Sequence, residues 1–316
     1  MNMIEILKPG PFSHIQDSGR RGYEYLGLSR SGPLDFRLFA VAQTLAGNSW
    51  DEAAIEMTYQ GLDFISDTPI VFSVAGVQDV RIGSHLYQLE SGERLVAQPG
   101  ERISLGTLRG QRAYLAIRGG FDISPVLGSH CTDFTAGIGG WHGRSLRAGD
   151  KIPIKHCVDA SISSRVSWSQ DLWTDHSPLQ VVVGPNADEF PASSLHALFQ
   201  GTYMITPASN IMGIRLQGPP VKPRVESSTK QSKGTIPGAI QVPPDAQPII
   251  LLNQRGTVGG YPVVATLPSP ELWRLAQWPT AKTLSFVAIS PAQAQALSKK
   301  AFQDLMTWHQ YVTDHA

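Results

Sequence analysis

The amino-acid sequence predicts a mainly β protein with few helices. Thirty glycines and 23 prolines among 316 residues interrupt the chain too often for long helices, which is typical of short strands joined by turns. Segments rich in β-branched and aromatic residues, such as 69–75 and 112–118, lie between these breaks. Hydrophobic residues make up 41% of the chain, which provides enough core for one large domain or two modest ones.

The first half of the chain is expected to form one strand after another. Residues 1–8 alternate apolar and polar side chains, which is the period of a strand. Glycine or proline separates the later segments. These further strands are expected at 69–75, 79–90, 93–98, 101–106 and 112–118.

One helix is expected among these strands. Asp35 is suited to cap its N-terminus rather than to act as a catalytic acid, and Gly47-Asn48 is suited to end it. An apolar stripe at i, i+3, i+4 and i+7 provides one face for burial. The stripe consists of Leu38, Val41, Ala42 and Leu45.

The second half is expected to form another β-rich lobe. Six serines fall within 158–178, where apolar periodicity is lost, so we place a linker there between lobes at 1–157 and 179–316. Seven prolines in 218–248 predict an extended surface loop. Strands are expected near 179–184, 201–206, 213–217, 247–253, 262–267 and 283–289, and helices near 269–277 and from Pro291 onward.

Charge and cysteine content argue against several functions. Acidic and basic residues balance at 26 each, so no net charge attracts nucleic acid or an anionic membrane. No apolar run approaches the roughly 20 residues that cross a bilayer. Cys131 and Cys157 are too few for a disulfide framework, and no secretory signal is evident. We therefore expect a cytoplasmic protein with no nucleic-acid or membrane partner.

Several catalytic motifs are absent from the sequence. There is no P-loop, no Gly-x-Ser-x-Gly elbow, and neither His-Glu-x-x-His nor a paired Cys-x-x-Cys to hold a metal. A biotin-attachment lysine flanked by methionines is missing as well. We expect no metal site, no biotin attached to this chain, and no self-contained enzyme of these classes.

Polar residues beside glycines mark the candidate binding segments of the first half. Asp17 and Arg20 lie in a glycine-containing turn, which a structural salt bridge would explain equally well. Further along, glycine-rich turns surround Ser129, Cys131 and Arg144. Their backbone amides are suited to bind an anion that Arg144 would hold bidentately, although turns between strands need no ligand. A lone cysteine such as Cys131 is more often a small buried hydrophobic residue than a nucleophile.

Two more polar segments lie in the second half. Arg215 is flanked by apolar residues within an expected strand, so we expect a buried partner for it, either a structural carboxylate or a ligand. Gln241 and Tyr261 lie among glycines, and their side chains suit recognition of a planar amide or ureido group.

The motifs become specific when they are taken together and in order along the chain. They are Gln16-Asp17-x-Gly19-Arg20-x-Gly22, Ser31-Gly32-x-x-Asp35, Gly47-Asn48, Ala54-Ile55-Glu56, Tyr114-Leu115-Ala116-x-x-Gly119-Gly120, Gly128-Ser129, Gly139-Gly140-x-x-Gly143-Arg144-x-Leu146-x-x-Gly149-Asp150, Met212-Gly213-x-Arg215-Leu216, Pro237-Gly238-x-x-Gln241-Val242-Pro243 and Gly259-Gly260-Tyr261-Pro262. From about residue 4 to about residue 290, the chain resembles the biotin-dependent carboxyltransferase family, also called allophanate hydrolase subunit 2.

This resemblance implies a fold of two cyclophilin-like β-barrel lobes and a multi-chain enzyme. The implied partner is a subunit-1-type protein (allophanate hydrolase subunit 1 or the B component of 5-oxoprolinase), joined in 5-oxoprolinase by a third, lactam-hydrolase subunit. Such a complex uses ATP to hydrolyse 5-oxoproline to glutamate, and we expect this activity on a small amide substrate. Two alternatives stay open: a urea- or allophanate-type carboxyltransferase subunit, and a non-catalytic regulatory partner of a kinase-inhibitor-like subunit-1 protein.

The resemblance also guides the choice of site residues. We expect Arg144, Arg215 and Gln241 to be catalytic anion or amide binders, and Asp17, Arg20, Ser129 and Tyr261 to bind substrate. Some residues depart from the family pattern, which commonly has Arg where this chain has Ile211 and an acid, an amide and a hydroxyl within 254–258. Arg255 and His130 would restore some of the charge, and the departures favour the regulatory alternative.

Overall fold

The computed structural model describes residues 2–90, 92–155, 167–168, 176–224 and 231–315. The chain divides into two compact units. Unit 1 comprises Met1–Arg21, Ser31–Trp173 and Asp304–Ala316, and unit 2 comprises Gly22–Arg30 and Thr174–Gln303. Residues 22–30 and 304–316 thus group with the other half of the chain, which the sequence did not indicate. Most of the predicted linker at 158–178 lies outside the described residues, so its bounds stay a prediction.

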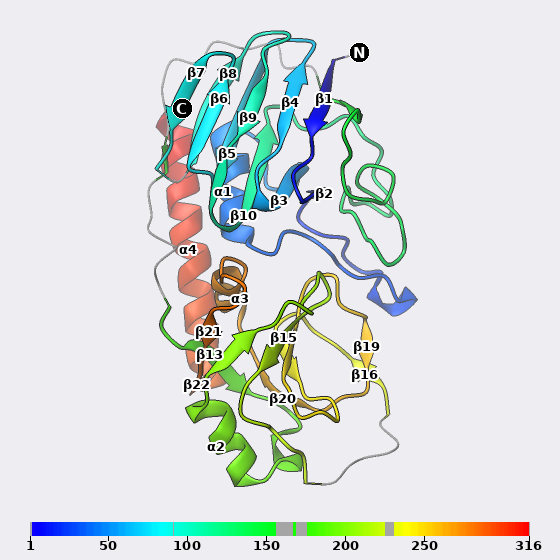
Figure 1. The fold of residues 1–316 in the computed structure, drawn as a ribbon, viewed down its shortest axis with the longest axis vertical. Coiled ribbons are helices and arrows are strands. Elements are labelled where there is room, and N and C mark those ends of the chain that lie inside the picture. The colour runs from blue at the N-terminus through cyan, green and yellow to red at the C-terminus, as the bar shows by residue number, and fades with distance from the viewer. Residues whose placement is uncertain (1, 91, 156–166, 169–175, 225–230, 316) are drawn as a thin grey trace. The chain divides into compact units, whose positions relative to one another are not determined.

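Unit 1 contains two antiparallel sheets (Figure 1). Phe64 of the first sheet meets Phe72 of the second edge-on, with ring centroids 5.9 Å apart, inside the core that the two sheets share. The first sheet has the order β11 (Lys151–Pro153), β1 (Met3–Lys8), β4 (Asp63–Ser66), β9 (Ile103–Leu105), β6 (Asp79–Ile82) and β7 (His85–Gln88). The second has the order β12 (Ser167–Trp168), β8 (Gly92–Ala97), β5 (Ile70–Ala75), β10 (Thr107–Ile117), β3 (Ala54–Gln60) and β2 (Phe12–Gln16).

Helix α1 (Phe36–Ala46) packs on the second sheet of unit 1. As predicted, Asp35 caps it, since Asp35 Oδ1 accepts a hydrogen bond from the Leu38 N–H at 3.2 Å. Gly47 ends the helix in the left-handed conformation, with φ of 78°. The predicted apolar stripe is buried, together with Ala75 and Tyr114 of the sheet.

Unit 2 is built on one eight-stranded sheet. Its strands pair antiparallel except β13 and β22, which run parallel. The order is β21 (Thr283–Leu284), β14 (Tyr203–Ile205), β15 (Gly213–Gln217), β18 (Ile249–Leu251), β17 (Ala239–Gln241), β20 (Val263–Thr266), β13 (Leu179–Val183) and β22 (Phe286–Ile289). The other elements of unit 2 are β16 (Lys233–Gly234), β19 (Val258–Gly259), η1 (Glu24–Leu26), η2 (Ala187–Glu189), α2 (Ala192–Gln200) and α3 (Ser269–Leu275). Helix α4 (Pro291–His315) begins in unit 2, and its residues from Asp304 onward belong to unit 1.

The predicted mainly β class is confirmed, and three details of the prediction are corrected. The segment 79–90 is a hairpin, because Gly83 turns the chain with φ of 55° between β6 and β7. The segment 218–248 is not all surface loop, since Pro237 and Pro243 flank the buried strand β17 without interrupting it. Helix α2 was missed because it is short and has no side-chain cap.

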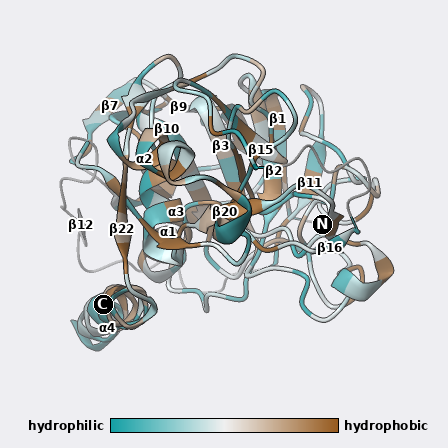
Figure 2. Cartoon of the chain, turned by 90° about the horizontal axis from the view of Figure 1, so that it is seen from below, coloured by the Kyte–Doolittle hydropathy of each residue, from teal (hydrophilic) through white to brown (hydrophobic). Residues whose placement is uncertain are grey.

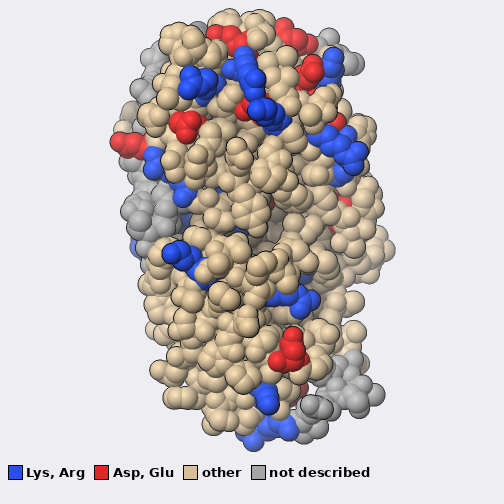
Figure 3. Space-filling view, in the orientation of Figure 1, with Lys and Arg blue, Asp and Glu red and all other residues tan. Residues whose placement is uncertain are grey.

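The face of the molecule seen in Figure 3 is mostly uncharged. Figure 3 shows Lys, Arg, Asp and Glu scattered over a face formed largely of other residues, as expected for a chain with 16% charged residues. Apolar and polar residues are mixed along many elements (Figure 2). Among the described residues, no helix combines the length and the apolar character needed to cross a membrane.

Candidate functional site

The turn that follows β2 brings Asp17 and Ser129 together in unit 1. The buried Asp17 carboxylate accepts hydrogen bonds from the Ser129 hydroxyl at 2.8 Å and from the Gly19 N–H at 2.9 Å. The His130 N–H donates to it as well, and His130 Nδ1 lies 3.4 Å from Asp17 Oδ2. Burial alone would raise the pKa of the Asp17 carboxyl, but the donors lower it well below its ordinary value of 3.8. Asp17 is therefore an ionised acceptor inside the protein.

Cys131 belongs to the same cluster and is fully buried. Its Sγ donates a hydrogen bond to Asp17 Oδ1 at 2.9 Å and accepts one from the Asp17 N–H at 3.2 Å. Burial, followed by the charge of Asp17, raises the pKa of the thiol well above its ordinary value. Because the thiolate is the nucleophilic form, this geometry makes Cys131 a hydrogen-bond donor and a poor nucleophile.

Arg20 joins this turn to the segment 126–131. Its Nε donates to Val126 O at 3.1 Å and its Nη2 to Cys131 O at 2.8 Å. Among the described residues, the buried Nη1 has no hydrogen-bond partner. Gly139 leaves room for the guanidinium, since a Cβ there would lie 2.7 Å from Nη2. Asp17, Arg20 and Ser129 thus lie close together, but most of their polar atoms bind one another or the backbone, and their role in binding substrate stays a prediction.

Arg144 is also in unit 1, and its partner is Asp150. Arg144 Nη1 lies 2.8 Å from Asp150 Oδ2, and Nη2 lies 2.7 Å from Oδ1, which is a bidentate pair. Nη1 also donates to Ser145 O at 2.8 Å. These hydrogen bonds raise the pKa of Arg144 above its ordinary value. The pair closes the loop before β11, so the structure gives Arg144 a structural role, and its catalytic role stays a prediction.

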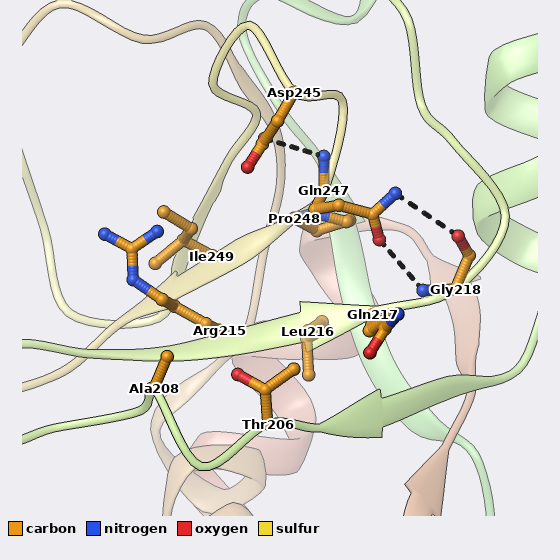
Figure 4. Close-up of a pocket in the computed structure, with 10 residues that line it drawn as sticks. All are labelled: Thr206, Ala208, Arg215, Leu216, Gln217, Gly218, Asp245, Gln247, Pro248 and Ile249. Carbon is orange, nitrogen blue, oxygen red and sulfur yellow. Dashed lines mark hydrogen bonds between the residues drawn. The ribbon is translucent and has the colours of Figure 1, made fainter.

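Arg215 lines a pocket of about 420 Å³ in unit 2 (Figure 4). Among the described residues, Arg215 has no structural carboxylate as a buried partner, because the alternation of β15 buries Ile214 and Leu216 and turns Arg215 to the exposed face. A ligand as its partner stays a prediction. Among the described residues, none accepts a hydrogen bond from its guanidinium. Asp245 lines the same pocket, and Gln247 is held by two hydrogen bonds to the backbone of Gly218. The pocket therefore contains an unpaired guanidinium and a carboxylate.

Gln241 and Tyr261 lie beside each other in unit 2. Gln241 is buried, and its Nε2 is 3.5 Å from Tyr261 O, a long hydrogen bond. The Tyr261 side chain is 44% exposed. Gly259 lets the Gln241 amide lie close to the backbone, since a Cβ at this position would lie 2.8 Å from Gln241 Nε2 and the amide would have to shift. The Gln241 amide therefore has donor and acceptor capacity that this weak contact does not use.

Arg255 is more deeply buried than expected for a residue that only replaces a missing charge. Arg255 is 3% exposed, and its Nη2 donates to Thr235 O at 2.9 Å and lies 3.5 Å from Glu24 Oε1. Within the described part of the chain, its Nε and Nη1 are buried without a hydrogen-bond partner. Burial lowers its pKa, which the nearby Glu24 opposes. Buried arginine donors without acceptors are costly, which makes Arg255 a candidate ligand-binding residue.

Register in the eight-stranded sheet relates two of the predicted catalytic residues. Arg215 of β15 and Gln241 of β17 are both register partners of Ile249 in β18. Directly paired residues of antiparallel strands present their side chains on the same face. Arg215, Ile249 and Gln241 therefore form one row on one face of this sheet.

No group of three or more His, Cys, Asp or Glu side chains in the described residues could hold a metal ion. The predicted site residues are divided between the units. Asp17, Arg20, Ser129 and Arg144 belong to unit 1, and Arg215, Gln241 and Tyr261 belong to unit 2.

Comparison with known proteins identifies relatives along nearly the whole chain. The sequence model of the family described as carboxyltransferase domain, subdomain A and B, matches residues 26–288. The chain is 35% identical over 294 residues to the C component of 5-oxoprolinase from Escherichia coli (strain K12), covering 92% of this chain and 93% of that protein. It is 31% identical to the urea amidolyase of Saccharomyces cerevisiae, covering 94% of this chain but only 17% of that protein.

Solved structures agree with these sequence matches. The crystal structure of the K. lactis urea amidolyase superposes with a TM-score of 0.85 at 27% identity, over 96% of this chain and 20% of that one. The Kluyveromyces lactis urea carboxylase superposes with a TM-score of 0.84, over 96% of this chain and 29% of that one. The likeness confirms the predicted fold class of two cyclophilin-like β-barrel lobes.

Proposed function

The chain belongs to the carboxyltransferase-domain family, subdomains A and B, and from this premise we propose that it is a subunit of an ATP-dependent 5-oxoprolinase. The complex would hydrolyse 5-oxoproline to glutamate in the cytoplasm, with a subunit-1-type protein and a third, lactam-hydrolase subunit as partners. The observation that supports this proposal most is the match to the C component of 5-oxoprolinase over nearly the full length of both chains.

The open pocket around Arg215 suits this substrate. 5-Oxoproline has a carboxylate, which a guanidinium binds bidentately. It also has a lactam N–H, which can donate a hydrogen bond to a carboxylate such as that of Asp245. Arg215 and Asp245 both line this pocket, and the Arg215 guanidinium has no partner among the described residues. In the proposal, Arg215 holds the substrate carboxylate and thereby orients the lactam ring.

The row that joins Arg215 to Gln241 suggests how the lactam carbonyl is polarised. Water adds to that carbonyl carbon and negative charge develops on its oxygen. The C–N bond then breaks, and the nitrogen takes up the proton that the water gives up and leaves as the amine of glutamate. An amide N–H aimed at the oxygen stabilises the charge as it develops. We assign this role to Gln241, whose Nε2 makes only a long hydrogen bond to Tyr261 O. ATP would supply the free energy of the reaction. Because this chain has no P-loop, we do not assign the binding of the adenosine part of ATP to any residue of this chain.

Carboxyl transfer to urea or to a related amide is the second candidate function. The superposition on urea amidolyase, with a TM-score of 0.85, favours it. The chain spans only 20% of that protein's length, so the whole activity would also require what the rest of that protein supplies. A urea-type substrate has no carboxylate, so it leaves Arg215 without the role proposed above.

Reconstitution tests the proposal directly. The chain is co-expressed with its subunit-1-type and lactam-hydrolase partners, and ATP-dependent release of glutamate from 5-oxoproline is measured. Activity that requires all three chains supports the proposal. A well-formed complex that releases no glutamate but carboxylates urea would establish the second function. A complex inactive on both substrates would point to the regulatory role that the departures at 211 and 254–258 favour.

A further inference from the structure

A second pocket lies in unit 1 at the C-terminal end of α1, and none of the residues discussed so far as site residues lines it. Its volume is about 410 Å³. The side chains relevant here are Thr44, Asn48, Ser49, Arg94, Arg118 and His309. Two of them are arginines, one is a histidine, and none of the residues that line the pocket is acidic. All of them belong to unit 1.

Arg94 is held in place within this pocket. Arg94 is buried, with 7% of the residue exposed. Its Nε donates to Leu45 O of α1. Among the described residues, neither of its Nη atoms makes a hydrogen bond. Neither atom is fully buried, since fully buried atoms without a partner do not include them. The two Nη groups are therefore the donors that open toward the pocket.

Arg118 follows β10 and brings a second positive charge to the pocket. In the part of the chain that the structure describes, its guanidinium makes no ion pair and no hydrogen bond. The two guanidinium groups repel each other: the pKa of Arg94 is lowered by its burial and, to a lesser extent, by the positive charge of Arg118. Two like charges held together without a carboxylate destabilise the folded chain unless an anion lies between them.

The frame around the arginines is already fixed. Asn48 Nδ2 donates to Ile117 O and to Gln43 Oε1, both at 2.8 Å, and the Gly119 N–H donates to Asn48 Oδ1 at 2.8 Å. These bonds tie the end of α1 to the residues on either side of Arg118. On the other side, His309 Nδ1 lies 2.8 Å from Thr44 Oγ1. A pre-formed frame of this kind lowers the entropy cost of binding a ligand.

Helix capping accounts for only part of this arrangement. The C-terminus of a helix carries a partial charge of roughly −0.5, which favours a nearby cation. Arg94 meets that need through its bond to Leu45 O. The partial charge of the helix end cannot neutralise a second guanidinium as well, and Arg118 makes no hydrogen bond to the helix end. The nearby Glu52 is already paired with Lys155 at 2.8 Å, and Asp314 accepts a hydrogen bond from Gln310.

We propose that this arginine pocket binds an oxyanion of the phosphate class, held by the Arg94 Nη groups and the Arg118 guanidinium, with His309 at its edge. A tetrahedral dianion offers the acceptors and the charge that two arginine forks match. The same chemistry could be supplied by inorganic phosphate or by the phosphates of a nucleotide. The proposal does not depend on the 5-oxoprolinase assignment, since it concerns binding to this chain alone.

Titration calorimetry of the full-length chain tests the proposal, at constant ionic strength because salt screens such sites. Inorganic phosphate, ATP and adenosine are the three probes. Arg118→Ala should weaken phosphate binding about tenfold or more, the usual loss for a hydrogen bond to a charged group. Arg118→Glu should abolish binding while the melting temperature is maintained or rises, because the new carboxylate pairs with Arg94. Arg81→Ala is the matched control, since Arg81 is an exposed arginine of β6 in the same unit.

The outcomes distinguish inorganic phosphate from a nucleotide as the bound oxyanion, and both of these from a result that overturns the proposal. Phosphate binding that depends on Arg118 and is unchanged by Arg81→Ala supports the site. ATP binding that is much tighter than phosphate, with the same dependence on Arg118, identifies a nucleotide as the source; equal affinities identify free phosphate. The proposal is overturned if neither phosphate nor ATP binds the wild type, or if Arg81→Ala weakens binding as much as Arg118→Ala. Adenosine binding with no contribution from phosphate would overturn it as well.

Discussion

Arg215 of β15 and Gln241 of β17 lie in one row of the eight-stranded sheet, each directly opposite Ile249. Two inter-strand spacings separate their backbones, which is about 10 Å. Arg215 is exposed at one end of the row and Gln241 is buried at the other. The proposed function uses the guanidinium at one end of this row and the amide at the other, and the first two predictions test these roles.

Arg215→Ala should lower kcat/KM for 5-oxoproline in the reconstituted complex by about tenfold or more, because a charged hydrogen bond to the substrate carboxylate is lost. Stability should change little, since the side chain is exposed and has no partner among the described residues. Lys282→Ala, which removes another exposed cation of unit 2, is the control. Unchanged kinetics in Arg215→Ala would remove Arg215 from the site.

Gly259→Ala should lower kcat by displacing Gln241. The new Cβ would lie 2.8 Å from Gln241 Nε2, so the amide must move. Gly256→Ala is a matched control three residues earlier, because there the nearest atom to the new Cβ is Val258 O at 3.4 Å. Steady-state kinetics of both variants make the comparison, and equal activities would show that the position of Gln241 is not important for catalysis.

Arg144 and Asp150 should behave as a structural pair. The two side chains are 27% and 10% exposed, so solvent screens them partly, and a coupling free energy of about 1 kcal/mol is expected. A double-mutant cycle with Arg144→Ala and Asp150→Ala, measured by urea unfolding, provides this value. If Arg144→Ala abolishes activity and leaves stability unchanged, the catalytic role predicted from the sequence is supported instead.

Asp17→Asn should destabilise the protein at neutral pH by about 1–3 kcal/mol, because a buried ionised acceptor is lost while its donors remain. The pKa of Asp17 is lowered on folding, so its stabilising contribution is present above the ordinary pKa of 3.8 and is lost as the pH falls below it. The difference in unfolding free energy between wild type and variant should thus be constant near neutral pH and shrink below about pH 4. Urea unfolding at several pH values measures it; a difference that grows on acidification would contradict the assignment.

Cys131 should resist alkylation in the folded protein. Its thiol is fully buried, and burial with the charge of Asp17 raises its pKa. Mass spectrometry after iodoacetamide treatment at about pH 8, near the ordinary pKa of a thiol, should find Cys131 unmodified in the native chain and modified after unfolding. Cys131→Ser, which keeps a donor for Asp17, should be more stable than Cys131→Val, which removes it. Rapid native labelling would show that the thiol is accessible and reactive.

Much of the fold was predictable because the signals are local. The helix at 36–46 has its cap, its apolar stripe and its terminal glycine within a short stretch of chain, and the structure has all three. Most strands follow from short β-branched runs between glycines and prolines. Helix α2 was missed because this local signal is absent: it has no side-chain cap to mark its start.

The candidate site was predicted less completely, because the sequence does not show which side chains pair in the folded chain, and because sheet register joins residues that are distant in the sequence. Arg144 and Asp150 belong to the same sequence motif, yet the motif does not reveal that they form an ion pair, or that Arg215 has no partner in the described residues. Arg94 and Arg118 belong to no motif and are brought together only by the pairing of β5 with β8 and β10.

The sequence by itself determined the mainly β class, the helix on the first lobe and the family, because periodicity, turns and motifs are properties of neighbouring residues. Tertiary structure alone decided which polar groups are free to bind a ligand. A guanidinium has the same chemistry wherever it lies along the chain. Whether it closes a loop, as in Arg144, or remains available, as in Arg215 and Arg118, depends on the carboxylates that folding places within hydrogen-bond distance.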